Sequence, residues 1–143
     1  MRMAYVVLTR LVGVAILVQF YFAAVGAFDR PQEDDSYSLH SINGMVVIPV
    51  LVLLATATAA LLRAPGKLIG LTVAPLGLVV VQVLIIVLGN AVSGGADGDT
   101  TPAGLAILAL HAVNGLVTMA VAGMAARRAR ELSKRPTAEV APA

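Results

Sequence analysis

Four long apolar runs dominate this sequence and decide what it can fold into. They cover residues 4–28, 39–62, 68–92 and 103–126, and Arg10 is the only charged residue inside them. A bilayer core requires about 20 apolar residues in helical form, and a backbone in lipid must satisfy its polar groups internally. The sequence therefore predicts an all-α integral membrane protein with four transmembrane helices. Residues 1–134 form one domain, and residues 135–143 form a disordered cytoplasmic tail.

Composition excludes several classes of function. Hydrophobic residues make up 59% of the chain, above the level of about 45–50% that is usual in globular domains. Because the chain has no cysteine, disulfides, iron–sulfur clusters and cysteine-rich zinc sites are excluded. No nucleophile, general-base pair or phosphate-binding loop stands out, so catalysis has little support. Nucleic acid is not expected as a partner, whereas the lipid bilayer is.

The basic residues are distributed unevenly between the apolar runs. Lysine and arginine gather at the N-terminus, between the second and third runs, and after the fourth run: Arg2, Arg10, Arg63, Lys67, Arg127, Arg128, Arg130, Lys134 and Arg135. These residue types favour the cytoplasmic side, so both termini are predicted to lie inside. The other two connections carry most of the acidic residues, with Arg30 as their only base. The basic stretch after residue 126 is expected to anchor on anionic lipid.

A cleaved signal peptide is the alternative for the first run. Arg2, the apolar stretch after it and the small residues at 23–27 resemble a signal sequence with a cleavage site. The apolar stretch is long for a signal, however, and it has a counterpart later in the chain. We therefore expect it to remain as a transmembrane helix.

Two short patterns each occur twice, in the same order. Gln followed by Gly seven residues later occurs in the first and third runs, and Leu-His-x-x-Asn-Gly occurs in the second and fourth. The residues are Gln19, Gly26, Gln82 and Gly89 in the first pattern, and His40, Asn43, Gly44, His111, Asn114 and Gly115 in the second. This repetition predicts a duplicated helical hairpin, with both copies in the same orientation. In an up-down-up-down bundle, the second and fourth helices then lie diagonally opposite.

The two histidines of this repeat predict a haem site. Polar groups inside a span are costly and suggest function, and the diagonal helices would bring His40 and His111 together. The leading hypothesis is a membrane haem b protein with these histidines as axial iron ligands, which transfers electrons or carries haem near the outer face. Glycines 26, 44, 89 and 115 would give clearance for the ring, and asparagines 43 and 114 would donate hydrogen bonds around it. Gln19 and Gln82 would bond between helices or contact the haem edge.

The depths of the histidines provide a test of this hypothesis. Counted from the outer end of each run, His40 lies about 12 Å farther out than His111. One iron requires both side chains at a single depth. We therefore expect the second helix to begin earlier, within residues 34–38, where several residues are suitable N-caps.

The helix order and paired histidines resemble one half of the haem A synthase family. That family is built from two four-helix bundles with paired histidines on the even helices, and the resemblance covers only His40, His111 and the helix order. This chain has a single bundle and lacks a convincing match to the acidic loop motif of the catalytic half, so haem hydroxylation is not implied. More closely, the chain resembles small uncharacterised four-span membrane proteins of high-GC actinobacteria. That resemblance implies the plasma membrane of a bacterium.

Other interpretations of the repeat remain open. The histidines, asparagines and glycines can serve helix packing alone, which would suit a non-enzymatic accessory or scaffold subunit of a larger membrane complex. A membrane redox partner is the corresponding expectation for the haem hypothesis. A small exporter is less favoured, because no carboxylate lies within the spans. Zinc is disfavoured, because two histidines do not complete its four ligands.

Overall fold

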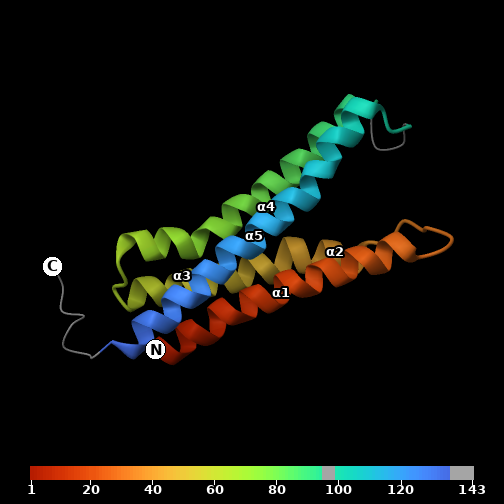
Figure 1. The fold of residues 1–143 in the computed structure, drawn as a ribbon. Coiled ribbons are helices and arrows are strands. Elements are labelled where there is room, and N and C mark those ends of the chain that lie inside the picture. Colours follow the sequence, from red (N-terminus) through yellow and green to blue (C-terminus); the bar gives the residue numbers. More distant parts are fainter. Residues whose placement is uncertain (95–98, 136–143) are drawn as a thin grey trace.

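The protein is an all-helical bundle made of two hairpins (Figure 1). The computed structural model describes residues 1–94 and 99–135, and no β-strand occurs in these ranges. Its elements are α1 (Arg2–Phe28), α2 (Ser38–Ile42), the π-helix η1 (Asn43–Val47), α3 (Ile48–Leu61), α4 (Gly66–Val92) and α5 (Pro102–Lys134). Because α2, η1 and α3 follow one another directly, they form one span. We call α1 to α3 the N-terminal hairpin, and α4 with α5 the C-terminal hairpin.

Four helices are long and apolar enough to cross a membrane, as predicted. They are Arg2–Phe28, Ser38–Leu61, Gly66–Val92 and Pro102–Lys134. The first three begin and end within two residues of the predicted limits, whereas the fourth continues eight residues beyond residue 126. It continues because Ala129 and Leu132 are buried against other helices of the bundle. Residues 136–143, which make up nearly all of the predicted disordered tail, lie outside the described residues.

The helices pack in the order expected for an up-down-up-down bundle. α1 packs against α3 and α5, and α4 packs against the same two helices. The second and fourth spans therefore lie on one diagonal of the bundle, and α1 and α4 lie on the other. The predicted fold class is confirmed.

The tightly packed part of the bundle lies toward the end where α1 begins and α5 ends (Figure 1). We call this end the base, and the opposite end, with the connection 29–37, the mouth. Two clusters of buried residues fill the base half: Tyr5, Val6, Ala59, Ala64, Ala129 and Leu132 in one, and Val12, Ala15, Ile16, Ile48, Val52 and Ala122 in the other. Many of these residues are alanines, which let helices approach closely enough for van der Waals packing in lipid.

Toward the mouth the two hairpins diverge, and a proline in α4 contributes to this shape (Figure 1). Pro75 lies inside α4 and is fully buried. It has no N–H to donate and its ring crowds the preceding turn, so it bends the helix. The first turns of α4 run beside α3, and the remainder follows α5 away from the N-terminal hairpin. The hairpins therefore separate above the packed core.

The second span contains a π-helical turn, whereas the fourth span is a continuous α-helix. The N–H of Ile48 bonds to the carbonyl of Asn43, five residues earlier. Pro49 follows, and in a regular α-helix its ring would clash with the carbonyl four residues before it. Ala120 holds the matching place in the second copy of the repeat, so nothing widens α5 there. The wider turn begins at Asn43, within the repeated motif, and such turns are frequent at functional sites.

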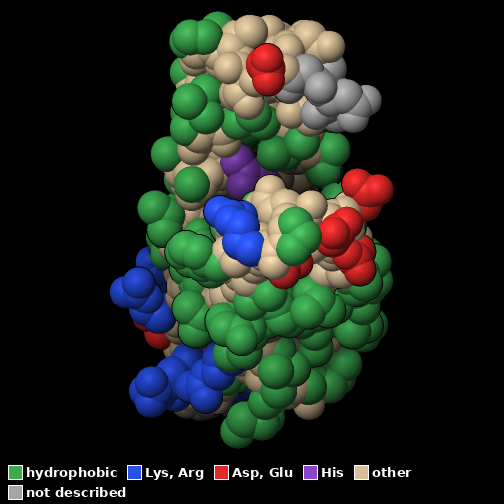
Figure 2. All heavy atoms as spheres, turned by 90° about the vertical axis from the view of Figure 1, so that its right-hand side faces the viewer, with side chains coloured by type: hydrophobic (Ala, Val, Ile, Leu, Met, Phe, Trp, Pro, Cys, Tyr) green, Lys and Arg blue, Asp and Glu red, His purple; other side chains and the backbone are tan. Residues whose placement is uncertain are grey.

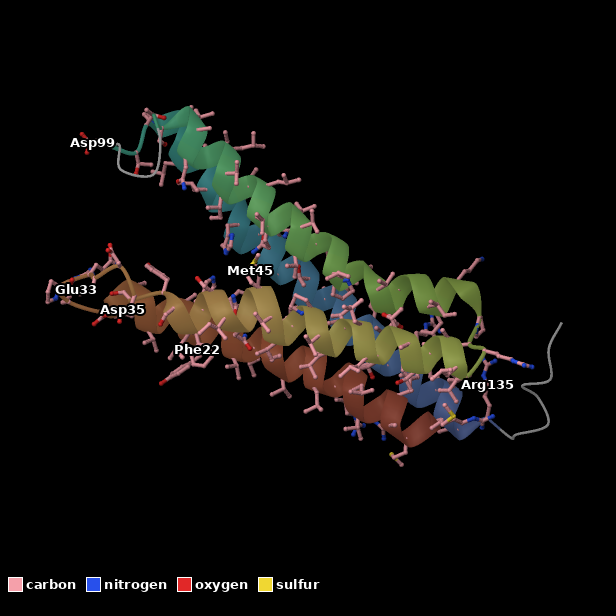
Figure 3. The ribbon with its side chains drawn as sticks, turned by 180° about the vertical axis from the view of Figure 1, so that it is seen from behind. Phe22, Glu33, Asp35, Met45, Asp99 and Arg135 are labelled. Atoms are coloured by element: carbon pink, nitrogen blue, oxygen red, sulfur yellow. The ribbon has the colours of Figure 1, made fainter. Side chains whose placement is uncertain are left out.

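Charge is segregated between the two ends of the bundle. Acidic side chains gather on the mouth face (Figure 2), where Figure 3 labels Glu33, Asp35 and Asp99. Arg135 lies at the base (Figure 3), and its carbonyl accepts a hydrogen bond from the guanidinium of Arg2. The base is therefore the basic end of the protein and the mouth is the acidic end.

One hydrogen bond at the base crosses the bundle from α1 to α4, and its removal tests the packing. The hydroxyl of Tyr5 lies 2.6 Å from that of Thr72, and both residues are buried. Thr72 donates to the carbonyl of Leu68, so Tyr5 is the donor of the pair. We expect Tyr5→Phe to lower the free energy of unfolding by about 1 kcal/mol, measured by thermal denaturation in detergent. Tyr21→Phe is the matched control, because Tyr21 is 66% exposed to lipid or solvent; equal effects of the two changes would contradict this packing.

Candidate functional site

In the N-terminal hairpin, a glutamine and an asparagine tie α1 to the second span. The side-chain N–H of Gln19 donates to the carbonyl of His40 at 2.9 Å. The amide of Asn43 donates to the side-chain oxygen of Gln19 at 2.7 Å and to the carbonyl of Ala15 at 2.9 Å. Each bond joins the two helices of the hairpin. Together they fix the helical register, because a shift along the axis would break all three.

The C-terminal hairpin repeats the same three bonds. Gln82 donates to the carbonyl of His111 at 3.0 Å, and Asn114 donates to the side chain of Gln82 and to the carbonyl of Leu78, the latter at 2.9 Å. Donors and acceptors correspond one to one with those of the first copy. The repeat seen in the sequence is therefore a repeat of hydrogen bonding, with Gln19 and Gln82 acting as the interhelical groups that were expected.

The two copies meet at their histidines. The ring centroids of His40 and His111 lie 5.9 Å apart, with the ring planes inclined at 46°. Both side chains are partly buried. Figure 2 shows a histidine at the bottom of a hollow between the two hairpins, facing the mouth. The pair therefore lies where the packed core ends and the opening begins.

The second span begins at Ser38, within the expected range of residues 34–38 but at its late limit. This start is only one residue earlier than the apolar run, so it does not by itself bring the two histidines to one depth. α5 instead begins at Pro102, nine residues before His111, whereas α2 begins two residues before His40. Counted from the base, His40 precedes Ala59 by 19 residues and His111 precedes Ala129 by 18, and those alanines share one cluster. Counting from the mouth was misleading because α5 extends farther beyond its histidine than α2 does.

The ring nitrogens of the two histidines are used differently. Nδ1 of His40 lies 3.2 Å from the carbonyl of Gln19, which suits a neutral ring that donates from Nδ1 and keeps the lone pair on Nε2. Nδ1 of His111, by contrast, is buried without a hydrogen-bond partner among the described residues. The histidine rings thus retain nitrogen atoms without a partner in the described part of the chain, whereas the side-chain amides of Gln19, Asn43, Gln82 and Asn114 are all hydrogen-bonded.

Gly44 and Gly115 make room for protein side chains. A Cβ on Gly44 would lie 2.6 Å from the amide nitrogen of Gln19, so glycine is needed for that amide to reach the second span. A Cβ on Gly115 would lie 3.3 Å from the ring of Phe20, which reaches over from the N-terminal hairpin. The clearance expected beside each histidine is therefore already filled by protein atoms.

Gly26 and Gly89 likewise serve contacts within their own hairpins. Beside Gly26 lies the ring of Tyr37, 2.6 Å from the place of an added Cβ. Tyr37 in turn stands edge-on to His40, with centroids 6.3 Å apart. Beside Gly89 lies the side chain of Leu108. These two glycines let the outer halves of the hairpins close, so any open space at the site comes from the divergence of the hairpins.

Three residues of the site were not singled out from the sequence. Tyr37 packs against His40 and Phe20 packs beside Gly115, and Met45 extends from η1 toward the C-terminal hairpin (Figure 3). Their signal in the sequence is weak, because the matching places of the second copy hold different residue types: Val83, Leu108 and Leu116. The described residues contain no group of three or more histidine, aspartate or glutamate side chains that could hold a metal ion by themselves. A metal at this site would need ligands beyond the two histidines.

Comparison with known families assigns the chain to one of them. A family model matches residues 19–90, which is half of the chain and includes Gln19, the His40 motif and Gln82. The chain belongs to DUF6220, a family of unknown function. His111 and Asn114 lie beyond the matched residues. The matched region therefore includes the whole first copy of the repeat and, from the second copy, only Gln82 and Gly89.

No curated protein and no solved structure matches the chain. The resemblance to haem A synthase thus gains no support from these comparisons. Membership of an uncharacterised family agrees with the second expected resemblance at that general level.

Substitution of Gly44 tests whether the amide network holds the N-terminal hairpin together. We expect Gly44→Ala to lower the free energy of unfolding by about 1–3 kcal/mol, because the new methyl group displaces the Gln19 amide from the carbonyl of His40. Gly13→Ala is the matched control, since nothing lies within 4 Å of its added Cβ; it should leave stability unchanged or raise it by up to about 1 kcal/mol. Denaturation in detergent measures both, and a neutral Gly44→Ala would show that the network contributes little.

Proposed function

We propose that this protein binds one haem b between its two hairpins, with His40 and His111 as axial ligands. The observation that carries the proposal is the approach of two imidazoles, 71 residues apart in the chain, to a centroid distance of 5.9 Å. Two metal–nitrogen bonds of about 2 Å each, on opposite sides of one metal, require ring centroids about 6 Å apart. The spacing of the pair therefore suits one iron.

The donor set also fits this group. A histidine that ligates a metal through one nitrogen usually donates the other N–H to a carbonyl or carboxylate, which orients the ring. His40 has such a bond to the carbonyl of Gln19, and its Nε2 remains available. The porphyrin itself supplies four of the iron ligands, so the absence of further ligating side chains near the pair is no obstacle. Space for the ring would come from the opening between the hairpins, with Phe20, Tyr37 and Met45 as apolar neighbours.

Haem held by two histidines supplies one-electron transfer, or is itself carried. Neither role requires a catalytic acid or base. The positively charged base would lie on the cytoplasmic side, so both termini would lie inside. The histidines would then lie toward the outer face of a bacterial plasma membrane. A membrane redox partner would then approach from the mouth.

A second candidate is an accessory or scaffold subunit of a larger membrane complex, without a cofactor. The observation that favours it is that protein side chains already occupy the space beside each glycine of the repeat. In that case the repeat serves packing alone, and the protein would co-purify with its complex and remain colourless.

Absorption spectroscopy separates the two candidates. The protein is expressed with haem supplied, purified in detergent, and measured in oxidised and reduced forms. We expect a low-spin haem b spectrum with about one haem per chain, lost in the double variant His40→Ala/His111→Ala and weakened in each single variant. A colourless wild type, or full haem in the double variant, would refute the proposal.

Two further variants keep ligation distinct from folding. Ser41→Ala changes an exposed neighbour of His40 and should keep the wild-type spectrum. His111→Met should retain haem with a raised reduction potential, because replacing one axial histidine by methionine has that effect. An unchanged potential in this variant would show that residue 111 is not a ligand.

A further inference from the structure

A groove of about 300 Å³ opens at the base between the start of α4 and the end of α5. Its volume is at the lower limit of small-molecule sites, which span about 300–1,000 Å³. The part contributed by α5 comes from one helical face, since Arg128 lies three and four residues before Glu131 and Leu132, and Arg135 follows directly after the last turn. It lies at the opposite end of the bundle from the histidines, so this inference is independent of the haem proposal.

The charge of the groove is positive. Lys67, Arg128 and Arg135 line it together with one acid, Glu131. Glu131 already accepts from Arg128 at 3.1 Å, and the pair is well exposed. Among the described residues, Lys67 and Arg135 have no carboxylate within ion-pairing distance. Two cationic side chains therefore remain to bind an anion in the groove.

The first turn of α4 adds to the attraction for an anion. The helix begins at Gly66 without a side-chain cap and without an acidic residue in its first turn. Its first hydrogen bonds come from the N–H groups of Leu68 and Ile69 to the carbonyl of Pro65. The N–H of Lys67 thus has no helical acceptor, and the positive end of the helix dipole lies in the same turn as this basic residue.

The remainder of the groove is apolar. Leu68, Leu71 and Leu132 line it beside the charged groups. The helices that form it are long and apolar enough to span a membrane, and the groove lies at one end of them. A molecule that matches this surface has an anionic head and a hydrocarbon tail. We infer that the groove binds an anionic phospholipid, with its phosphate at Lys67 and Arg135 and an acyl chain along the leucines.

Native mass spectrometry in detergent tests this site with phosphatidylglycerol and phosphatidylcholine as probes. The wild type should retain one phosphatidylglycerol in preference to phosphatidylcholine. Lys67→Gln/Arg135→Gln should weaken this binding about ten-fold or more, because each basic residue near an anionic headgroup contributes substantially. Arg127→Gln/Arg130→Gln also removes two positive charges from the base, but at positions that do not line the groove. This control should change binding less than two-fold.

Each other result contradicts the site. Equal losses in the two double variants would indicate diffuse electrostatic attraction to the base. Lack of preference for phosphatidylglycerol over phosphatidylcholine would overturn the inference. Displacement of the lipid by an equal concentration of inorganic phosphate or glycerol phosphate would also overturn it, because the ligand would then be a soluble anion. If Lys67→Gln impairs folding, Arg135→Gln alone is decisive, since residue 135 lies beyond the end of α5.

Discussion

The hydrogen bonds of Gln19 and Gln82 are the interaction on which the rest of this structure depends. A polar amide inside an apolar bundle is costly unless each of its groups has a partner. Each glutamine donates to the carbonyl of a histidine and accepts from an asparagine of the same motif. Such bonds contribute only about 0.6 kcal/mol on average in membrane proteins. Their value lies in register, because only one alignment of the two helices satisfies all of them at once.

Register within the hairpins, combined with alanine packing at the base, determines where the histidines meet. Ala59 and Ala129 share a buried cluster near the termini, and helical rise from that level brings His40 and His111 to the same height. Above that height the hairpins separate, and Pro75 turns α4 so that it follows α5. The structure therefore combines a closely packed base with an opening that begins at the histidine pair.

The sequence was sufficient for the features that rest on periodicity and composition. The four spans, the bundle order and the duplication follow from apolar length, short connections and the repeated Gln and His-Asn-Gly patterns, and the structure agrees with each. Two features depended on tertiary detail. The depth of the histidines could not be obtained by counting from the mouth, because α5 extends farther beyond its histidine than α2 does. The role of the glycines could not be obtained from spacing, because only the fold shows that Gln19, Tyr37, Phe20 and Leu108 fill the space beside them.

The two copies of the repeat have diverged at the place where they would act together. Pro49 produces a π-turn beside His40, whereas Ala120 leaves α5 regular beside His111. Nδ1 of His40 faces a carbonyl at hydrogen-bonding distance, whereas Nδ1 of His111 lacks a well-formed bond among the described residues. The two copies therefore keep the same interhelical amide bonds but differ at the histidine side chains and in the turn that follows them.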